Sequence, residues 1–275
     1  MTSVVEALRA AAARLAATSD TARLDAELLM AHALGCSRSD LLLRHMGAEA
    51  PESFAALVDR RAKHEPVAYI LGSQEFRGLD FAVSAAVLIP RADSECVVEA
   101  ALEASPQAGR VLDCGTGSGA LLLALLHDLP QAQGVGIDAS PAALVVATAN
   151  ASSLGLAARA AMHLRDWTRP GWSADLGTFD LILANPPYVE DDATLDASVR
   201  EHEPASALFA GPEGLDDYRV LIPQLPALLN PGGVAVLEIG STQVEAVSAV
   251  AVASGFSATC RADLAGRPRA LILRQ

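Results

Sequence analysis

An apolar run in the middle of the chain ends on four residues that could do chemistry. The run FDLILA is followed directly by Asn185, Pro186, Pro187 and Tyr188. One interpretation is structural: Pro187 lacks the N–H group that a further β-ladder pair needs, so the strand would simply end. The other is chemical, because two proline rings would fix the backbone so that the Asn185 side chain and the adjacent carbonyls face a ligand.

A second segment, LDCGTGSGA at residues 112–120, predicts a loop that binds a cofactor. Its three glycines allow a sharp turn, the close approach of a ligand, and tight packing of the following helix. Asp138 ends the next predicted strand, where its carboxylate can accept hydrogen bonds from both hydroxyls of a ribose. The pattern indicates a nucleoside-bearing cofactor. The predicted cofactor-binding residues are Gly115, Thr116, Gly117, Ser118, Gly119 and Asp138, together with Asn185.

The glycine spacing alone leaves two cofactor classes open, since Gly115-x-Gly117-x-x-Ala120 also satisfies the dinucleotide fingerprint. Two features favour S-adenosylmethionine. Asp113 directly precedes the glycines, where its charge would repel a pyrophosphate and attract a sulfonium and an ammonium group. The NPPY group ends a later strand of the same predicted sheet, and therefore opens onto the same crevice. A hydride-transfer enzyme has no evident need of so rigid a tetrapeptide.

Other polar residues give weaker indications. Asp166 and Trp167 follow a predicted short strand, a position suited to the edge and face of an adenine, although a structural tryptophan is an alternative. Arg91 could contact cofactor or substrate, but a surface ion pair is a common role for such an arginine. The six histidines are scattered and no two of the four cysteines form a C-x-x-C pair. The sequence therefore predicts neither a metal site nor a disulfide framework.

From about Ala92 onward the apolar pattern alternates between strands and helices. Strand-like runs such as RVLDCG, GVGID, FDLILAN, GGVAVLEIG and RALILRQ are separated by helix-like segments such as SGALLLALLHDL, SPAALVVATANASSLG, VLIPQLPALLN and TQVEAVSAVAVASG. This alternation is typical of a mostly parallel, doubly wound α/β sheet of Rossmann-like type with helices on both faces. Ligands of such sheets bind outside the carboxyl ends of the strands.

Residues 1–74 predict a small bundle of helices. Ser3 and Glu6 fit a capping box, and Gly35 fits the position that ends a second helix. SRSDLLLRHM and PESFAALVDRRAKHE predict two further helices. These segments contain no evident catalytic pairing, so we expect the bundle to recognise a partner.

The period of the pattern changes after the helices. Residues 75–91 alternate around Gly78 and predict a β-hairpin linker. We therefore expect three parts: a helical recognition domain at 1–74, the linker at 75–91, and a cofactor-binding domain at 92–275.

Composition limits the partners and the compartment. The 275 residues, 51% apolar and 19% charged, indicate a globular chain long enough for two cores. A net charge of −13 argues against broad binding of DNA or RNA, which needs a basic face. No apolar stretch is long enough to cross a bilayer, and the charged N-terminal helix is unlike a secretory signal. We expect a cytoplasmic monomer that contacts neither nucleic acid nor membrane.

Several stretches together resemble the bacterial release factor glutamine methyltransferase family over most of the chain. EPVAYILGSQEFRGLDFAV resembles the segment before its catalytic domain, LIPRADSE its linker, DCGTGSG its cofactor loop, and NPPYV with EPASALFAGPEGLDDY its active-site strand and the segment that follows. The sequence departs from the family pattern at Ala92, Asp93, Ser94 and Cys114. The motif NPPY alone also resembles that of DNA adenine and RNA guanine amino-methyltransferases.

The resemblance implies a class I S-adenosylmethionine-dependent methyltransferase that acts on the glutamine of the Gly-Gly-Gln loop of peptide chain release factors. An amide nitrogen is a poor nucleophile because its lone pair is delocalised. Asn185 and the Pro186 carbonyl, stiffened by Pro187, would accept the amide hydrogens, and Tyr188 would pack over the amide plane. Two alternatives are an amino-methyltransferase acting on adenine or guanine, and a non-catalytic nucleotide-binding module.

Overall fold

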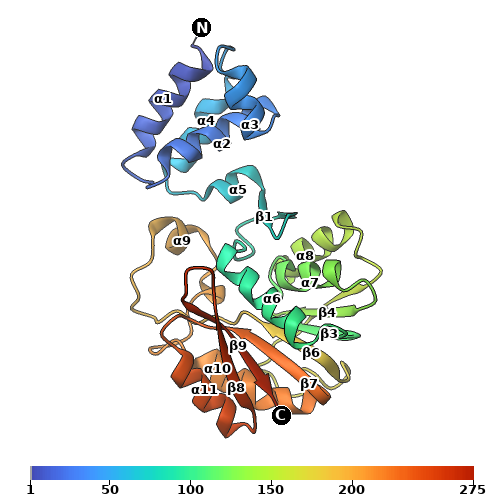
Figure 1. Ribbon diagram of the computed structural model, residues 1–275. Coiled ribbons are helices and arrows are strands. Elements are labelled where there is room, and N and C mark those ends of the chain that lie inside the picture. Colours follow the sequence, from blue (N-terminus) through green and yellow to red (C-terminus); the bar gives the residue numbers. More distant parts are fainter. Residues whose placement is uncertain (1) are drawn as a thin grey trace. The chain divides into compact units, whose positions relative to one another are not determined.

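The computed structural model describes residues 2–275, which form two compact units (Figure 1). One unit contains the residues up to Ser73 together with Leu195–Glu203, and the other contains Gln74–Thr194 and Pro204–Gln275. The sequence-based boundaries at 1–74, 75–91 and 92–275 remain a prediction. They differ from this grouping, because Leu195–Glu203 lies with the helical residues and the predicted linker at 75–91 lies in the same unit as the sheet.

The helical unit is built around one apolar core. The predicted capping box is present, since the Ser3 hydroxyl accepts from the Glu6 N–H and the Glu6 carboxylate accepts from the Ser3 N–H. Gly35 ends the second helix with a φ of 64°, as the sequence predicts. Buried residues such as Leu15, Leu29 and Met30 fill the centre. The helices are α1 (Val4–Leu15), α2 (Ala22–Leu34), α3 (Arg38–Asp40) with a π-helical continuation (Leu41–His45), α4 (Ser53–Arg61), α5 (Val67–Leu71) and α9 (Ala197–His202).

The second unit contains a seven-stranded sheet in the order β5-β4-β3-β6-β7-β9-β8. The first five strands of that order run parallel, and β9 is antiparallel to both β7 and β8. The chain builds outward from β3 in one direction and from β6 in the other, which creates a switch point between these two strands. The strands are β3 (Arg110–Cys114), β4 (Gln133–Asp138), β5 (Ala160–Leu164), β6 (Phe179–Ala184), β7 (Leu229–Glu238), β8 (Ser257–Ala262) and β9 (Pro268–Arg274).

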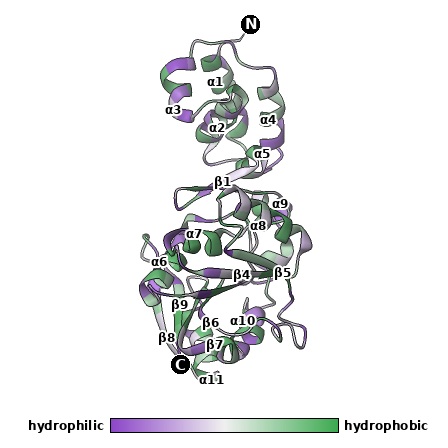
Figure 2. Cartoon of the chain, turned by 90° about the vertical axis from the view of Figure 1, so that its right-hand side faces the viewer, coloured by the Kyte–Doolittle hydropathy of each residue, from purple (hydrophilic) through white to green (hydrophobic). Residues whose placement is uncertain are grey.

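Helices cover both faces of this sheet and enclose two apolar clusters. Helix α7 is buried along almost its whole length, which explains its nearly uniform apolar sequence and its green colour in Figure 2. The mostly parallel, doubly wound sheet predicted from the alternating pattern is confirmed. The helices of this unit are α6 (Glu95–Ala104), α7 (Ala120–Asp128), α8 (Pro141–Ser153), α10 (Asp216–Leu221) and α11 (Val244–Ala253).

A two-stranded hairpin, β1 (Ser73–Phe76) with β2 (Leu79–Ala82), precedes the sheet. Arg77 and Gly78 both have positive φ, of 51° and 75°, which matches the tight turn that suits twisted strands. The predicted hairpin at 75–91 was too long at its C-terminal end, because the alternation beyond Ala82 belongs to an extended loop.

The pattern missed one helix and one strand of this unit and misplaced another helix. Helix α6 follows the linker where no helix was predicted, and β8 forms an antiparallel pair with β9. The helix predicted over VLIPQLPALLN begins earlier, at Asp216, and continues as a 3-10 segment over Ile222–Leu228. Pro223 and Pro226 explain this change, since each lacks the N–H that an α-helical hydrogen bond requires.

Candidate active site

The sheet register brings the predicted site residues to one edge. Cys114 at the end of β3 pairs with Ile137 of β4 on one side and with Ala184 of β6 on the other. The residues that follow these three positions are Gly115, Asp138 and Asn185. Three separate parts of the sequence therefore leave the sheet side by side at the switch point, where doubly wound folds bind ligands.

The glycine loop has the conformation that its sequence predicts. Gly115, Gly117 and Gly119 have φ of 76°, 54° and 85°, a region that favours glycine. A Cβ on Gly115 would lie 3.1 Å from the Trp167 ring, and one on Gly119 would lie 2.9 Å from the Leu123 side chain. The absence of a side chain at Gly115 therefore lets the indole ring pack against the loop, and its absence at Gly119 lets the following helix pack closely.

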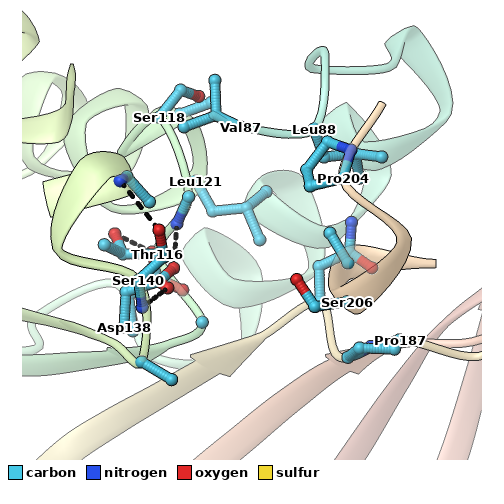
Figure 3. Close-up of a pocket in the computed structure, with 18 of the residues that line it drawn as sticks. Val87, Leu88, Thr116, Ser118, Leu121, Asp138, Ser140, Pro187, Pro204 and Ser206 are labelled. Atoms are coloured by element: carbon cyan, nitrogen blue, oxygen red, sulfur yellow. Dashed lines mark hydrogen bonds between the residues drawn. The ribbon is translucent and has the colours of Figure 1, made fainter. Parts of the chain in front are cut away.

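Asp138 holds this loop through the backbone. Its carboxylate accepts the Gly117 N–H at 2.9 Å and the Ser140 N–H at 2.8 Å, and these bonds are drawn in Figure 3. A carboxylate has about four lone-pair positions, so both oxygens can still accept from a ligand hydroxyl. Asp138 therefore combines a structural role with the position predicted for contact with a ribose.

Asp113 is the buried charge of the site. Its Oδ2 accepts from the Thr116 hydroxyl at 2.7 Å, whereas its buried Oδ1 has no hydrogen-bond partner among the described residues. Burial raises the pKa of Asp113 to about 7, the Thr116 hydroxyl opposes this rise, and the charge of Asp138 adds to it. A bound cation would supply the missing partner and favour the ionised carboxylate.

Because the pKa of Asp113 is raised, we expect binding of the cofactor to depend on pH. In the protein without cofactor, the pKa of this carboxyl lies above the ordinary value of 3.8, so the folded state favours the protonated form. The contribution of Asp113 to folding stability is therefore fully present below about pH 4 and is lost as pH rises toward about 7. A bound cation favours the ionised carboxylate instead of the protonated form. Because a larger fraction of Asp113 is ionised at higher pH, we expect S-adenosylmethionine affinity to increase several-fold from pH 6 to 7.5. Calorimetry of wild type and Asp113→Asn measures the effect. The variant should bind at least about tenfold more weakly at pH 7.5, with a flatter pH dependence; equally flat curves for both proteins would contradict the assignment.

A pocket of about 450 Å³ opens above these loops, within the range of ligand sites. Figure 3 shows Thr116, Asp138 and Ser140 on one side and Pro187, Pro204 and Ser206 on the other, with Leu121 between them. Val87 and Leu88 of the extended loop after β2 contribute apolar surface. One wall thus carries the predicted cofactor residues, and the opposite wall carries part of the NPPY group.

Asp166 and Trp167 also line this pocket. The Trp167 Nε1–H donates to Asp217 at 3.1 Å, and the Trp167 carbonyl accepts from Gln224 at 3.1 Å. The hydroxyl and the N–H of Thr168 hydrogen-bond to Asp166 and lower the pKa of that carboxyl. The indole therefore has a fixed orientation over the glycine loop, and Asp166 is an anion that can accept a hydrogen bond from a ligand.

The NPPY residues divide between two environments. Asn185 and Pro187 line the pocket, whereas Pro186 and Tyr188 are not among its lining residues. No hydrogen bond within residues 2–275 occupies the Asn185 side chain, so its amide is available to a ligand. The Tyr188 hydroxyl instead donates to the buried Glu238 carboxylate at 3.2 Å.

Several residues around the site were missed in the sequence. Four of them line the pocket: Ser94, which directly precedes α6, and Pro204, Ser206 and Ala207. Glu238 and Arg269 lie behind Tyr188. Glu238 could have been suspected, because a carboxylate at the end of an almost wholly apolar strand is unusual.

The six histidines of the chain lie away from the pocket. None of the histidines lines the pocket, and the described residues contain no group of three His, Cys, Asp or Glu side chains arranged to hold a metal ion. Within residues 2–275, no helix has the length and apolar character needed to cross a membrane.

Comparison with known proteins gives matches in both units. Residues 6–72 match the model of the PrmC N-terminal domain, and residues 106–260 match that of a methyltransferase domain. The release factor glutamine methyltransferase of Geobacter sulfurreducens is 46% identical over 244 residues, covering 86% of this chain and 84% of that protein. That of Moorella thermoacetica is 46% identical over 277 residues, covering 97% and 96%.

This chain belongs to the release factor glutamine methyltransferase family. The resemblance inferred from NPPY together with the helical segment, the linker and the cofactor loop is therefore confirmed. A methyltransferase from Pyrococcus furiosus superposes with a TM-score of 0.53 at 17% identity, covering 72% of this chain and 90% of that structure. At so low an identity this similarity shows the shared fold alone.

Membership of the release factor glutamine methyltransferase family identifies the chain as a methyltransferase enzyme. The non-catalytic alternative is thereby excluded.

Proposed function

We propose that this enzyme transfers a methyl group from S-adenosylmethionine to the side-chain amide nitrogen of the glutamine in the Gly-Gly-Gln motif of peptide chain release factors. We also propose that it does so as a cytoplasmic monomer. The observation that carries this proposal is the position of Asn185, which faces the pocket from the strand beside the glycine loop. The names of its relatives support the substrate.

The residues of the pocket fit S-adenosylmethionine on three grounds. The unpartnered Asp113 Oδ1 provides a negative charge for a cation, and Asp138 provides acceptors for a ribose. The Trp167 ring provides a flat apolar surface beside the glycines. When bound, this cofactor supplies a methyl group attached to a positively charged sulfur atom.

The chain's own contribution is to orient the amide. The Asn185 side-chain carbonyl can accept one amide hydrogen, and the Pro186 carbonyl can accept the other. Proline rings at two successive positions restrict the backbone, so these acceptors lose little freedom when the substrate binds. Acceptors aimed at the amide hydrogens stabilise the positive charge that grows on nitrogen during methylation.

The amide also explains why the pocket needs no general base. A nitrogen that has gained a methyl group and a positive charge is acidic, and its extra proton leaves to water. This agrees with the composition of the pocket wall, whose described residues include no histidine. Asp113 is unsuited to this task because it is buried against the glycine loop and bonded to Thr116.

Transfer of labelled methyl groups tests the proposal directly. We expect the purified enzyme to label a release factor, and to leave unlabelled a release factor whose Gly-Gly-Gln glutamine is replaced by alanine. DNA and RNA are included as substrates because NPPY also occurs in amino-methyltransferases. Label on nucleic acid in place of the release factor would favour that alternative and refute the proposal.

We further propose that the helical unit recognises the release factor outside the Gly-Gly-Gln loop. All pocket residues belong to the other unit, so removal of residues 1–73 should leave S-adenosylmethionine affinity within a few-fold of wild type. Methylation of an intact release factor should fall by about 10²-fold or more, the loss expected when remote binding energy is removed.

A short Gly-Gly-Gln peptide is the matched control substrate for this truncation. The truncated and full-length enzymes should methylate the peptide at similar rates, because a peptide cannot use the remote contacts. The measurements belong at low temperature, since residues 195–203 lose their packing partners in the truncated protein. Equal rates of both enzymes on the intact release factor would rule out the recognition role.

A further inference from the structure

Tyr188 is held at more points than a residue that only ends a strand would require. Its hydroxyl donates to Glu238 Oε1 at 3.2 Å and accepts from Arg269 Nη1 at 3.4 Å. Its N–H donates to the Leu208 carbonyl at 3.2 Å, and its carbonyl accepts from Gln243 Nε2 at 3.0 Å. The ring, the N–H and the carbonyl of this residue are therefore all fixed.

The carboxylate behind Tyr188 is one of the least accessible in the protein. Glu238 is 1% exposed, and its Oε2 has no hydrogen-bond partner among the described residues. Burial raises the pKa of Glu238, whereas the hydroxyls of Ser94 and Tyr188 and the positive charge of Arg269 oppose that rise. A buried carboxyl with one unmet oxygen costs stability, so its presence indicates a role other than filling the core.

Arg269 connects the Tyr188 hydroxyl to the segment before α6. Its Nη2 donates to Asp93 at 3.1 Å, and its Nη1 also donates to the Ile239 carbonyl at 3.4 Å. The Tyr188 hydroxyl thus lies between an anion at the end of β7 and a cation on β9. Burial and the charge of Glu238 raise the pKa of Tyr188, so the phenol stays protonated and donates its hydrogen bond.

We propose that Glu238 and Arg269 are positioning residues, which fix the Tyr188 hydroxyl and thereby hold Asn185 at the pocket wall. The position of Asn185 depends closely on that of Tyr188, because only Pro186 and Pro187 separate them in the chain. The two proline rings restrict the backbone between them. A shift of Tyr188 would therefore move Asn185. This inference rests on the proposed function, in which Asn185 binds the substrate amide.

The test is a double-mutant cycle with Tyr188→Phe and Glu238→Gln. Each change keeps the shape of the side chain and weakens the same hydrogen bond. We expect each to lower kcat for release factor methylation about tenfold, with S-adenosylmethionine affinity within about twofold of wild type. The double variant should be no slower than the slower single variant, since both act through one contact.

Tyr218→Phe is the matched control. The Tyr218 hydroxyl is buried and also bonds to Glu238, but it donates to the backbone carbonyl at 2.8 Å and lies outside the NPPY group. Its loss should lower thermal stability and leave kcat within about twofold. If Glu238 served only to stabilise the fold, Glu238→Gln would likewise lower thermal stability and leave kcat within about twofold of wild type.

Hydrogen exchange separates failure of this inference from failure of the proposed function. The N–H groups at positions 188 and 189 both donate to the Leu208 carbonyl, at 3.2 and 2.8 Å. Their exchange should accelerate about tenfold in Tyr188→Phe and Glu238→Gln but not in Tyr218→Phe, whichever substrate the enzyme methylates. Wild-type exchange together with unchanged kcat in both folded variants would overturn the proposal, and Arg269→Lys provides a further variant if either fails to fold.

Discussion

Replacement of Asn185 by alanine is expected to lower single-turnover methylation of a release factor by about 10²–10³-fold, the usual cost of losing one preorganised hydrogen-bonding group. The reason is that Asn185 is the NPPY side chain that reaches the pocket with its amide available. Affinity for S-adenosylmethionine should change much less. Stability should also be close to wild type, because the residue follows the end of β6 and its side chain makes no hydrogen bond to another residue in the described range 2–275.

Asn230→Ala is the matched control for this experiment. Asn230 also lies at one end of a strand, as the second residue of β7, but it is outside the pocket and donates to Asp180 at 2.7 Å. Its variant should lose some stability and keep its methylation rate. If Asn185→Ala folds, binds cofactor and methylates within a few-fold of wild type, NPPY serves only to end the strand.

Replacement of Asp138 by alanine is expected to weaken S-adenosylmethionine binding by about 2–4 kcal/mol, the value of a pair of charge-assisted hydrogen bonds. The structure adds a second reason for a large effect. The same carboxylate accepts the Gly117 and Ser140 N–H groups, so its loss also releases the glycine loop. Titration calorimetry measures the affinity directly.

Asp180→Ala separates these two contributions. Asp180 likewise accepts two backbone N–H groups, those of Gly109 and Arg110, each at 2.9 Å, but it does so away from the cofactor pocket. Loss of Asp180 should lower stability without weakening cofactor binding. Unchanged affinity in a folded Asp138→Ala protein would refute the predicted contact with the ribose.

The parts of the fold that could be predicted are those governed by local rules. Glycines at positive φ, a capping box and alternating apolar runs each depend on a few neighbouring residues, and all three appear where the sequence places them. Helix α6 was missed although its sequence is rich in helix-forming residues and buries Val97, Val98 and Ala101 at helical spacing. Strand β8 escaped prediction because tertiary packing defines it. The pattern of β8 is largely exposed, and its pairing with β9 makes it a strand.

The candidate site shows the same division. The cofactor loop and NPPY are contiguous motifs, so the sequence reveals them directly. Glu238 and Arg269 lie about 50 and 80 residues beyond Tyr188, and only the sheet order brings them to it. The chain departs from the family pattern at Asp93 and Ser94, but both residues still provide polar groups. The Asp93 carboxylate accepts a hydrogen bond from Arg269, and the Ser94 hydroxyl lowers the pKa of Glu238.

The discontinuity of the helical unit has a consequence for how the protein is made. Residues 1–73 emerge first from the ribosome, but Leu195–Glu203, which belongs to the same unit, is translated about 120 residues later. At about 5–20 residues per second, this delay lasts roughly 6–24 seconds. During that interval the Lys63 carbonyl has no His202 ring to contact at 3.1 Å, and α9 does not yet exist. The N-terminal helices therefore reach their final packing only after strand β6 and the NPPY group have been synthesised, so a translation product truncated before residue 195 contains the cofactor loop but lacks a complete helical unit.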